Sequence, residues 1–254
     1  MDLKNAVGIV TGSSSGVGAA TARLLASKGC NVVVNYSRSA DAAQKVASEC
    51  EAMGVEVLCC QANVAEDEDC RRMVDAAMDK WGKINALINN AGTTTFVPHE
   101  NLDGLSKQDF FDIYGVNVVG PYQMTRAAEA GMRMSGNAAI VNVDSVAGIY
   151  GIGSSIAYAA SKGALLTMTK SLARVLGPEI RVNAVCPGFI QGDWLTEGLG
   201  KEAYEKSKAY LENRAPLQLT CSPETVAESI LQFVEGHSVI TGQYVVLDGG
   251  NHLI

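Results

Sequence analysis

The sequence predicts an α/β fold, a doubly wound parallel sheet of about seven strands with helices on both faces. The first observation is that short runs rich in valine, isoleucine and leucine alternate with longer helical patterns along the chain. Such alternation is typical of repeated β–α–β units, whose crossovers are right-handed. The second observation is that the apolar runs are nearly continuous, as in strands that helices cover on both faces.

The predicted elements follow the chain in a regular order. Strands are expected at residues 6–11, 31–36, 55–61, 86–90, 138–143, 181–186 and 244–247. Helices are expected near residues 17–28, 40–53, 66–81, 106–133, 155–176 and 223–235. The stretch 192–216 has few β-branched residues, which predicts a helical insertion over the edge of the sheet. No linker or repeat divides the chain, so we expect a single domain over residues 1–254.

Composition excludes some classes of partner. The chain has 254 residues, of which 47% are hydrophobic and 19% charged, enough for a sizeable core. Its net charge of −7 disfavours nucleic acid and anionic membranes, which require a basic surface. No apolar stretch reaches the roughly 18 residues of a membrane span, and the N-terminal residues lack a secretion-signal pattern. We expect a cytoplasmic protein with neither kind of partner.

The cysteines and histidines do not form a metal or disulfide pattern. The seven cysteines are scattered without CxxC spacing, and the three histidines lie far apart. We therefore expect no metal site and a reducing compartment. The adjacent Cys59 and Cys60 are interpreted as small apolar residues on a buried strand, with a redox-active pair as the alternative.

A glycine-rich loop, "TGSSSGVG" at residues 11–18, joins the first predicted strand to the first helix. Gly12 permits a tight turn, Gly16 lets the backbone approach a phosphate, and Gly18 lets the helix pack close to the sheet. The helix N-terminus adds unpaired N–H groups and a partial positive charge. Dinucleotide binding is therefore expected here, with contacts from Gly12, Ser14, Ser15, Gly16, Val17 and Gly18.

The end of the second predicted strand indicates which dinucleotide binds. An acidic residue there would bind the ribose 2′-hydroxyl of NAD, but residues 31–40 contain none. Instead Tyr36 is followed by Ser37 and Arg38, and an arginine beside a hydroxyl suits a 2′-phosphate. NADP(H) is the expected cofactor; the alternative is that Arg38 is only a solvated turn residue and that NAD(H) binds.

A tyrosine and a lysine lie four residues apart in "SSIAYAASKG", residues 154–163. Residues at this spacing share one helix face, so Lys162 can lie beside Tyr158. A phenol has a pKa near 10, too high for an efficient base at neutral pH. A nearby ammonium group favours the phenolate, so the pair predicts an acid–base site.

Together these motifs resemble those of the short-chain dehydrogenase/reductase family over nearly the whole chain. The resemblance rests on "TGSSSGVG", "NNAG" (89–92), Asn117 in "GVNVVG", Ser145 after the fifth strand, "YAASK" (158–162), "PG" (187–188) and "TGQYVVLDGG" (241–250). It implies a Rossmann-type fold and an oxidoreductase resembling 3-oxoacyl-[acyl-carrier-protein] reductases. It also implies a homotetramer that pairs the long helices 106–133 and 155–176 and uses the C-terminal strand.

The resemblance implies a catalytic tetrad of Asn117, Ser145, Tyr158 and Lys162. Tyr158 would exchange a proton with the substrate oxygen while hydride moves to or from the nicotinamide. Ser145 would hydrogen-bond the same oxygen, Lys162 would bind the nicotinamide ribose, and Asn117 would position a relay water. Further cofactor contacts are implied for Asn63 and Val64 at the adenine, Asn90, Ala91 and Gly92 at the adenine ribose, and Pro187, Gly188 and Ile190 at the nicotinamide.

Four positions depart from the family pattern. Asn63 replaces a frequent aspartate, and its side-chain oxygen can still accept a hydrogen bond from adenine. Gly192 stands where a threonine often contacts the cofactor. Ser15 stands where NADP enzymes often have a basic residue. Asp144 precedes the serine in place of a small residue, and strand alternation points it away from Ser145, which predicts a structural or interface role.

The leading functional hypothesis is an NADP(H)-dependent oxidoreductase acting on a ketone or secondary alcohol, with a 3-oxoacyl thioester as the foremost substrate. An apolar pocket is expected from Thr94, Phe96, His99, Val146, Tyr150, Ile152 and Trp194, where His99 either binds substrate or faces solvent. One alternative is an NAD(H)-dependent alcohol, sugar or steroid dehydrogenase. An alternative of another class is a non-catalytic, NADP-binding redox sensor.

Overall fold

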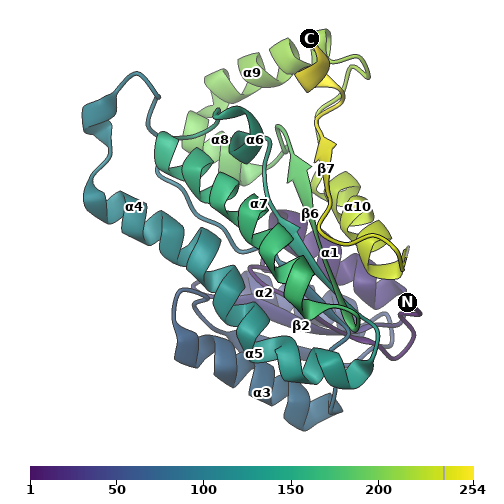
Figure 1. The fold of residues 1–254 in the computed structure, drawn as a ribbon. Helices are drawn as coiled ribbons and strands as arrows, with labels where there is room; N and C mark the ends of the chain where they lie inside the picture. The colour runs from purple at the N-terminus through teal and green to yellow at the C-terminus, as the bar shows by residue number, and fades with distance from the viewer. Residues whose placement is uncertain (237) are drawn as a thin grey trace.

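The computed structural model describes residues 1–236 and 238–254 and has one seven-stranded sheet in the order β3-β2-β1-β4-β5-β6-β7 (Figure 1). Every neighbouring pair is parallel. The strands are β1 (Val7–Val10), β2 (Asn31–Tyr36), β3 (Val57–Gln61), β4 (Ala86–Asn89), β5 (Ala138–Val143), β6 (Ile180–Pro187) and β7 (Tyr244–Leu247). This confirms the predicted doubly wound α/β fold.

Helices cover both faces of the sheet (Figure 1). One face packs against α1 (Gly16–Ser27), α2 (Ala40–Glu51) and α10 (Pro223–Glu235), and the other against α3 (Asp67–Trp81), α5 (Gly120–Ser135) and α7 (Ile156–Leu176). Within β2, Val32 and Val34 belong to the first apolar cluster and Val33 to the second. Alternate residues of one apolar run thus serve two cores, which explains why the strands are continuously apolar.

The long helix expected at 106–133 is divided. It consists of α4 (Lys107–Tyr114), a π-helical turn η2 (Gly115–Val119) and then α5. Ser106 caps α4 by a reciprocal capping box with Asp109. The π-helical turn carries Asn117, whose side chain is fully buried, and such turns frequently mark functional sites.

The expected insertion is helical, with α8 (Asp193–Leu199) and α9 (Lys201–Arg214) above the sheet (Figure 1). The structure adds short elements that the sequence did not indicate: α6 (Ala147–Tyr150), η1 (Leu102–Gly104) and η3 (Asn251–Leu253). Cys59 and Cys60 lie on the edge strand β3 and are only half-buried, less than expected, because β3 has a neighbouring strand on one side only.

Candidate active site

The glycine-rich loop follows β1 at the carboxyl edge of the sheet. Gly12 has a φ of +62°, and a Cβ there would lie 2.9 Å from the Cα of Ala91; a Cβ at Gly18 would lie 2.4 Å from the Gly12 carbonyl oxygen. Gly16 has a φ of +52° and open space beside it. Ser15, the N-cap of α1, makes no side-chain capping bond. The loop is therefore tightly packed beneath, and it is open where α1 presents its N–H groups, an arrangement that fits a phosphate.

Two asparagines, Asn35 and Asn90, hold this loop in place. Asn35 accepts a hydrogen bond from the Gly12 N–H (2.9 Å) and donates one to the Ala62 carbonyl (3.0 Å). Asn90 donates to the carbonyl oxygens of Thr11 and Gly12, at 2.9 and 3.1 Å. Asn35 was not among the predicted site residues, although a polar residue within the run "VVVNY" is an available signal. The "NNAG" motif therefore fixes the loop as well as adjoining the site.

The predicted specificity residues gather where β2 ends. Tyr36 is half-buried, whereas Ser37 and Arg38 are exposed. Arg38 forms no ion pair with any residue that the structure describes. Asn63 follows β3, the strand beside β2, and its side-chain oxygen accepts a hydrogen bond from the Ala65 N–H (3.2 Å). That oxygen is thus held by its own loop, a detail that sequence alone did not suggest.

Ser145, Tyr158 and Lys162 converge at the end of β5. The Ser145 hydroxyl accepts from the Ala147 N–H at 3.1 Å, which fixes it after the strand. Ser155 caps α7 by accepting from the Tyr158 N–H (3.2 Å), so the tyrosine lies in the first turn of the helix. The Lys162 Nζ donates to the Val143 carbonyl (2.8 Å) and lies 5.7 Å from the centre of the Tyr158 ring.

Asn117 reaches this cluster from the π-helical turn. Its amide donates to the Thr93 carbonyl and to the Ser161 hydroxyl, both at 3.0 Å, and its oxygen accepts from the Thr93 N–H at 2.8 Å. Ser161 donates in turn to the Tyr158 carbonyl at 2.7 Å. The structure thus brings together all four residues of the predicted tetrad, and it adds Ser161, which the sequence analysis missed because a helical serine carries no distinctive signal.

The electrostatics of the cluster differ from expectation. Burial raises the pKa of Tyr158; the Ser145 hydroxyl opposes this shift, and the charge of Asp144 reinforces it. Burial also lowers the pKa of Lys162, against the effect of Asp144. In the protein alone, burial of the Tyr158 phenol outweighs the lowering of its pKa that the nearby ammonium predicts. The physical reason is that both groups are removed from water, which disfavours either charged form.

Asp144 is placed differently from the prediction. Its Oδ1 accepts a hydrogen bond from the Ser145 N–H (2.8 Å), and its charge raises the pKa of both Lys162 and Tyr158. Its side chain is only 3% exposed in a single chain, so it is unavailable for an interface. Asp144 still follows the alternation of β5 toward α7, but Ser145 lies beyond it in the loop after Val143, so both side chains lie near the same groups of α7.

The loop after β6 completes the edge of the site. The Pro187 carbonyl accepts from the Val146 N–H (3.0 Å), and the Gly188 N–H donates to the Leu247 carbonyl (2.8 Å). A Cβ on Gly188 would lie 2.9 Å from the Cβ of Asp248, so a larger residue would displace this loop. Ile190 pairs with Cys221 in an isolated bridge. These contacts place the predicted nicotinamide-side residues at the carboxyl edge of β6, beside Ser145.

Aromatic residues cover the cluster from above. The ring centre of Trp194, on α8, lies 6.1 Å from the ring centres of both Phe96 and Tyr158. Gly192, which begins α8 with a φ of +138°, donates its N–H to the Tyr204 hydroxyl (3.3 Å). This bond anchors the loop where the family pattern has a threonine.

The other predicted pocket residues are less uniformly placed. Thr94 hydrogen-bonds the Ser154 hydroxyl (2.7 Å), and Tyr150 stacks on His252 with ring centres 6.2 Å apart. Ile152 is exposed. The Nε2 of His99 is buried without a hydrogen-bond partner among the described residues, so this histidine does not simply face solvent.

Known proteins share this fold and much of this sequence. The family model described as enoyl-(acyl carrier protein) reductase matches residues 12–252. The chain belongs to the short-chain dehydrogenase/reductase family. It is 40% identical over 98% of its length, and 96% of the relative's, to the Streptomyces violaceoruber protein assigned to the granaticin polyketide synthase as ketoacyl reductase 2. It is 36% identical over 98% of its length, and 99% of the relative's, to the 3-oxoacyl-[acyl-carrier-protein] reductase of Thermotoga maritima.

Solved structures of this family superpose closely. A short-chain dehydrogenase/reductase from Burkholderia xenovorans matches with a TM-score of 0.91 and 40% identity, covering 98% of this chain and 99% of that one. NAD⁺-bound xylitol dehydrogenase matches with a TM-score of 0.89 and 26% identity, covering 98% and 100%. This short-chain dehydrogenase/reductase is therefore an oxidoreductase acting on alcohol or carbonyl groups.

Two absences apply to the described part of this family member. Across residues 1–236 and 238–254, no group of three or more histidine, cysteine, aspartate or glutamate residues is arranged to hold a metal ion. No helix in the same residues is both long and apolar enough to cross a membrane.

Proposed function

We propose that this enzyme is an NADPH-dependent ketoreductase whose foremost substrate class is the 3-oxoacyl thioester. The observation that carries the proposal is the convergence of Ser145, Tyr158 and Lys162 at the carboxyl edge of the sheet, beside the open glycine-rich loop. Ligands of doubly wound sheets bind at this edge.

The residues have separate roles in the proposed reaction. Tyr158 donates its phenolic proton to the substrate carbonyl oxygen, and its raised pKa keeps that proton in place at neutral pH. Ser145 donates a hydrogen bond to the same oxygen and orients it. Lys162 stabilises the phenolate that forms, and Asn117 holds a water that returns the proton. The bound nicotinamide supplies the hydride.

Contacts for the cofactor follow the sheet edge. Gly12, Ser14, Ser15, Gly16, Val17 and Gly18 would hold the pyrophosphate; Tyr36, Ser37, Arg38, Asn63, Val64, Asn90, Ala91 and Gly92 the adenosine half; Tyr158, Lys162, Pro187, Gly188 and Ile190 the nicotinamide half. The choice of NADPH over NADH rests on the exposed Arg38 and on the lack of an acidic residue at the end of β2. The similarity to an NAD⁺-bound dehydrogenase keeps NAD(H) as the alternative.

The substrate class rests on two observations. Relatives 40% and 36% identical carry ketoacyl or 3-oxoacyl reductase names, and Phe96 and Trp194 form an apolar wall beside Tyr158. Enoyl reduction is a weaker candidate despite the family model's description. The reason is that the enoyl reductases of this superfamily usually separate the tyrosine and lysine by more than the three residues found here.

The test is oxidation of NADPH by the purified protein with 3-oxoacyl thioesters, ketosteroids, diketones and keto sugars, and with NADH in parallel. We expect turnover that prefers NADPH and a 3-oxoacyl thioester. Tyr158→Phe should abolish turnover and retain cofactor binding, whereas Tyr210→Phe, an exposed tyrosine on α9, should leave both unchanged. Full activity of Tyr158→Phe, or none in the unaltered enzyme with cofactor bound, would overturn the assignment and favour a redox sensor.

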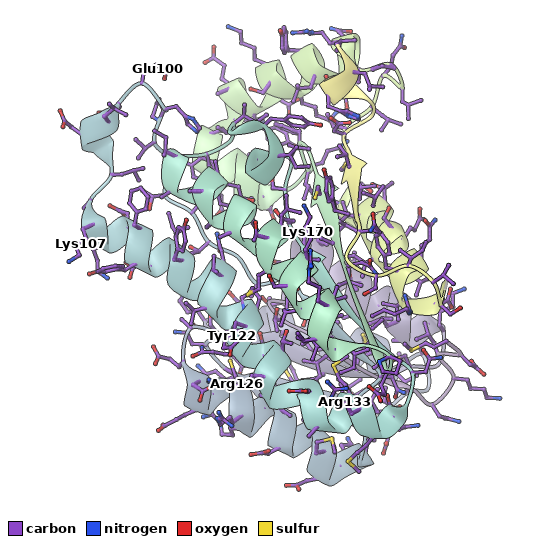
Figure 2. All side chains as sticks on the ribbon, viewed as in Figure 1. Glu100, Lys107, Tyr122, Arg126, Arg133 and Lys170 are labelled. Carbon is purple, nitrogen blue, oxygen red and sulfur yellow. The ribbon has the colours of Figure 1, made fainter. Side chains whose placement is uncertain are left out.

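The exposed apolar residues support the proposed homotetramer. Phe111 on α4 and Tyr122 on α5 are 58% and 47% exposed, and Val175 on α7 is 65% exposed. Figure 2 shows Lys107, Tyr122 and Arg126 along the outer side of α4 and α5. Light scattering of the protein after gel filtration should give the mass of four chains, and charged substitutions at Phe111 and Tyr122 should lower it.

A further inference from the structure

Asp144 lies on the side of the sheet that faces α7. Two residues earlier in the chain, Asn142 donates its side-chain amide to the Thr169 hydroxyl of α7 at 2.8 Å. Val143 belongs instead to the apolar cluster on the opposite face, with α1 and α10. Because successive side chains alternate along a strand, Asp144 follows Asn142 toward α7. Its N–H still bonds to the Val185 carbonyl at 2.8 Å, so the strand geometry persists there.

The Lys162 ammonium lies next to Asp144 along β5, although the two form no ion pair within 4.0 Å. The Lys162 Nζ donates a hydrogen bond to the Val143 carbonyl at 2.8 Å. This carbonyl belongs to the peptide group that joins Val143 to Asp144. Both side chains are almost completely buried, with 3% of Asp144 and 4% of Lys162 exposed. The Asp144 Oδ1 accepts from the Ser145 N–H, and Oδ2 is buried with no hydrogen-bond partner among the described residues.

Few ionisable groups face this carboxyl group. From α7 these are Lys162 and Tyr158, and from β6 it is Cys186, whose pKa burial raises so that it stays neutral. Among these groups Asp144 is the acidic side chain, and once it ionises above its raised pKa of about 7 its charge opposes the loss of the Lys162 proton. A buried ammonium without such a partner tends to lose its proton, since low dielectric penalises the charged form.

We propose that Asp144 is a positioning residue that keeps the buried Lys162 protonated. The Lys162 charge can then stabilise the phenolate that Tyr158 becomes when it gives its proton to the substrate. The inference rests on the proposed ketoreductase function. Family members often have a small residue at this position, where this chain carries a carboxylic acid. It acts through Lys162 and does not itself exchange a proton with the substrate.

The sign of the expected effect follows from the cluster. Burial lowers the pKa of Lys162, and the charge of Asp144 opposes that shift. The same charge raises the pKa of Tyr158. Removing the carboxylate should therefore let both residues lose their protons at lower pH. Carbonyl reduction needs both the Tyr158 proton and the Lys162 charge. Both changes would therefore lower activity at alkaline pH.

The experiment compares the pH profile of NADPH-dependent ketone reduction in the unaltered enzyme and in Asp144→Asn. We expect the alkaline limb of kcat/KM to move at least about one pH unit lower, which is about a tenfold loss on that limb, with the KM for NADPH little changed. Asp79→Asn, an exposed carboxylate on α3, is the matched control. If Asp144→Asn does not fold, Asp144→Ser takes its place.

A second readout needs no turnover. Tyrosinate absorbance is titrated with pH in the unaltered protein and in Asp144→Asn, and the matching Tyr158→Phe trace is subtracted from each. The Tyr158 titration should move to lower pH when Asp144 is replaced. An unchanged alkaline limb with an unchanged Tyr158 titration would overturn the proposal, even if stability changed. Lack of ketone reduction by the unaltered enzyme would count against the proposed function, while the titration would still test Asp144.

Discussion

Asn117 and Ser161 are joined by a 3.0 Å hydrogen bond between two completely buried side chains. The bond connects the π-helical turn to α7 and continues to the Tyr158 carbonyl through the Ser161 hydroxyl. The backbone of the tyrosine is thus fixed from a segment about forty residues away in sequence, as expected for a preorganised site. The relationship makes Ser161 a support for Tyr158 rather than a group that contacts substrate.

Replacing Ser161 with alanine should therefore impair both stability and turnover. We expect the free energy of unfolding to fall by about 1–2 kcal/mol because a buried hydrogen bond is lost. The kcat should fall by roughly tenfold, since small displacements of a reacting group are costly. Urea denaturation and steady-state kinetics measure the two effects.

The control for this substitution lies on the same helix. Ser171 also donates to a helix carbonyl, that of Thr167 at 3.2 Å, but its side chain is exposed. Ser171→Ala should leave both quantities nearly unchanged. Equal losses in the two variants would mean that the effect arises from helix propensity alone.

The sheet was predictable because its signal is carried by side-chain type. Apolar residues fill every strand position between two helix layers, so each strand is visible as a run. The division of the expected helix 106–133 was not predictable, because a π-helical turn is a change of backbone hydrogen bonding that leaves the apolar periodicity almost intact. Asn117 could be predicted only through a family motif, and its partner Ser161 not at all.

Asp144 shows a different limit of sequence analysis. Alternation along β5 holds as far as Asp144, which faces α7, but it does not extend to Ser145, which lies in the loop after the strand. In the protein alone, burial also raises the Tyr158 pKa against the lowering expected from Lys162. The residue types were sufficient to identify the cluster, but the desolvation that sets its pKa values depends on three-dimensional packing.

Gly16→Ala should reduce cofactor binding more than it reduces stability. Open space surrounds the position, so an added methyl group meets nothing in the protein. Its positive φ costs a non-glycine residue about 1 kcal/mol, while the methyl group would stand where a phosphate approaches. Fluorescence titration with NADPH should show at least about tenfold weaker binding, equivalent to about 1.4 kcal/mol.

Gly136→Ala is the matched control for this loop variant. Gly136 ends α5 with a φ of +70° and also has open space beside it. The same backbone strain should give a similar loss of stability and no change in NADPH binding. Weakened binding in Gly136→Ala would indicate that strain alone, rather than contact with phosphate, explains the result for Gly16.

Arg38→Gln should change the preference between the two dinucleotides. If Arg38 binds the 2′-phosphate, its removal costs about 1.5–3 kcal/mol for NADPH, a roughly ten- to hundredfold rise in KM. The KM for NADH should change little. Lys45→Gln, an exposed cation on the neighbouring α2, should leave both constants unaltered. Parallel rises for NADPH and NADH in Arg38→Gln would contradict a role in specificity.

The stability of the protein should depend on pH through Asp144. Burial raises the pKa of this carboxyl group from 3.8 to about 7. Between these values the folded protein binds a proton that the unfolded chain has lost, so this group's contribution to stability falls as pH rises through that window. The shift corresponds to at most about 4 kcal/mol.

Asp144→Asn removes this titration while retaining the side-chain oxygen that accepts from the Ser145 N–H. Urea denaturation at pH 5 and pH 8 should show the unaltered protein losing stability relative to Asp144→Asn at the higher pH. The variant would then be more stable and yet reduce ketones over a narrower pH range, because the charge that serves Lys162 is costly to bury. A constant difference in stability between the two proteins at both pH values would contradict the raised pKa.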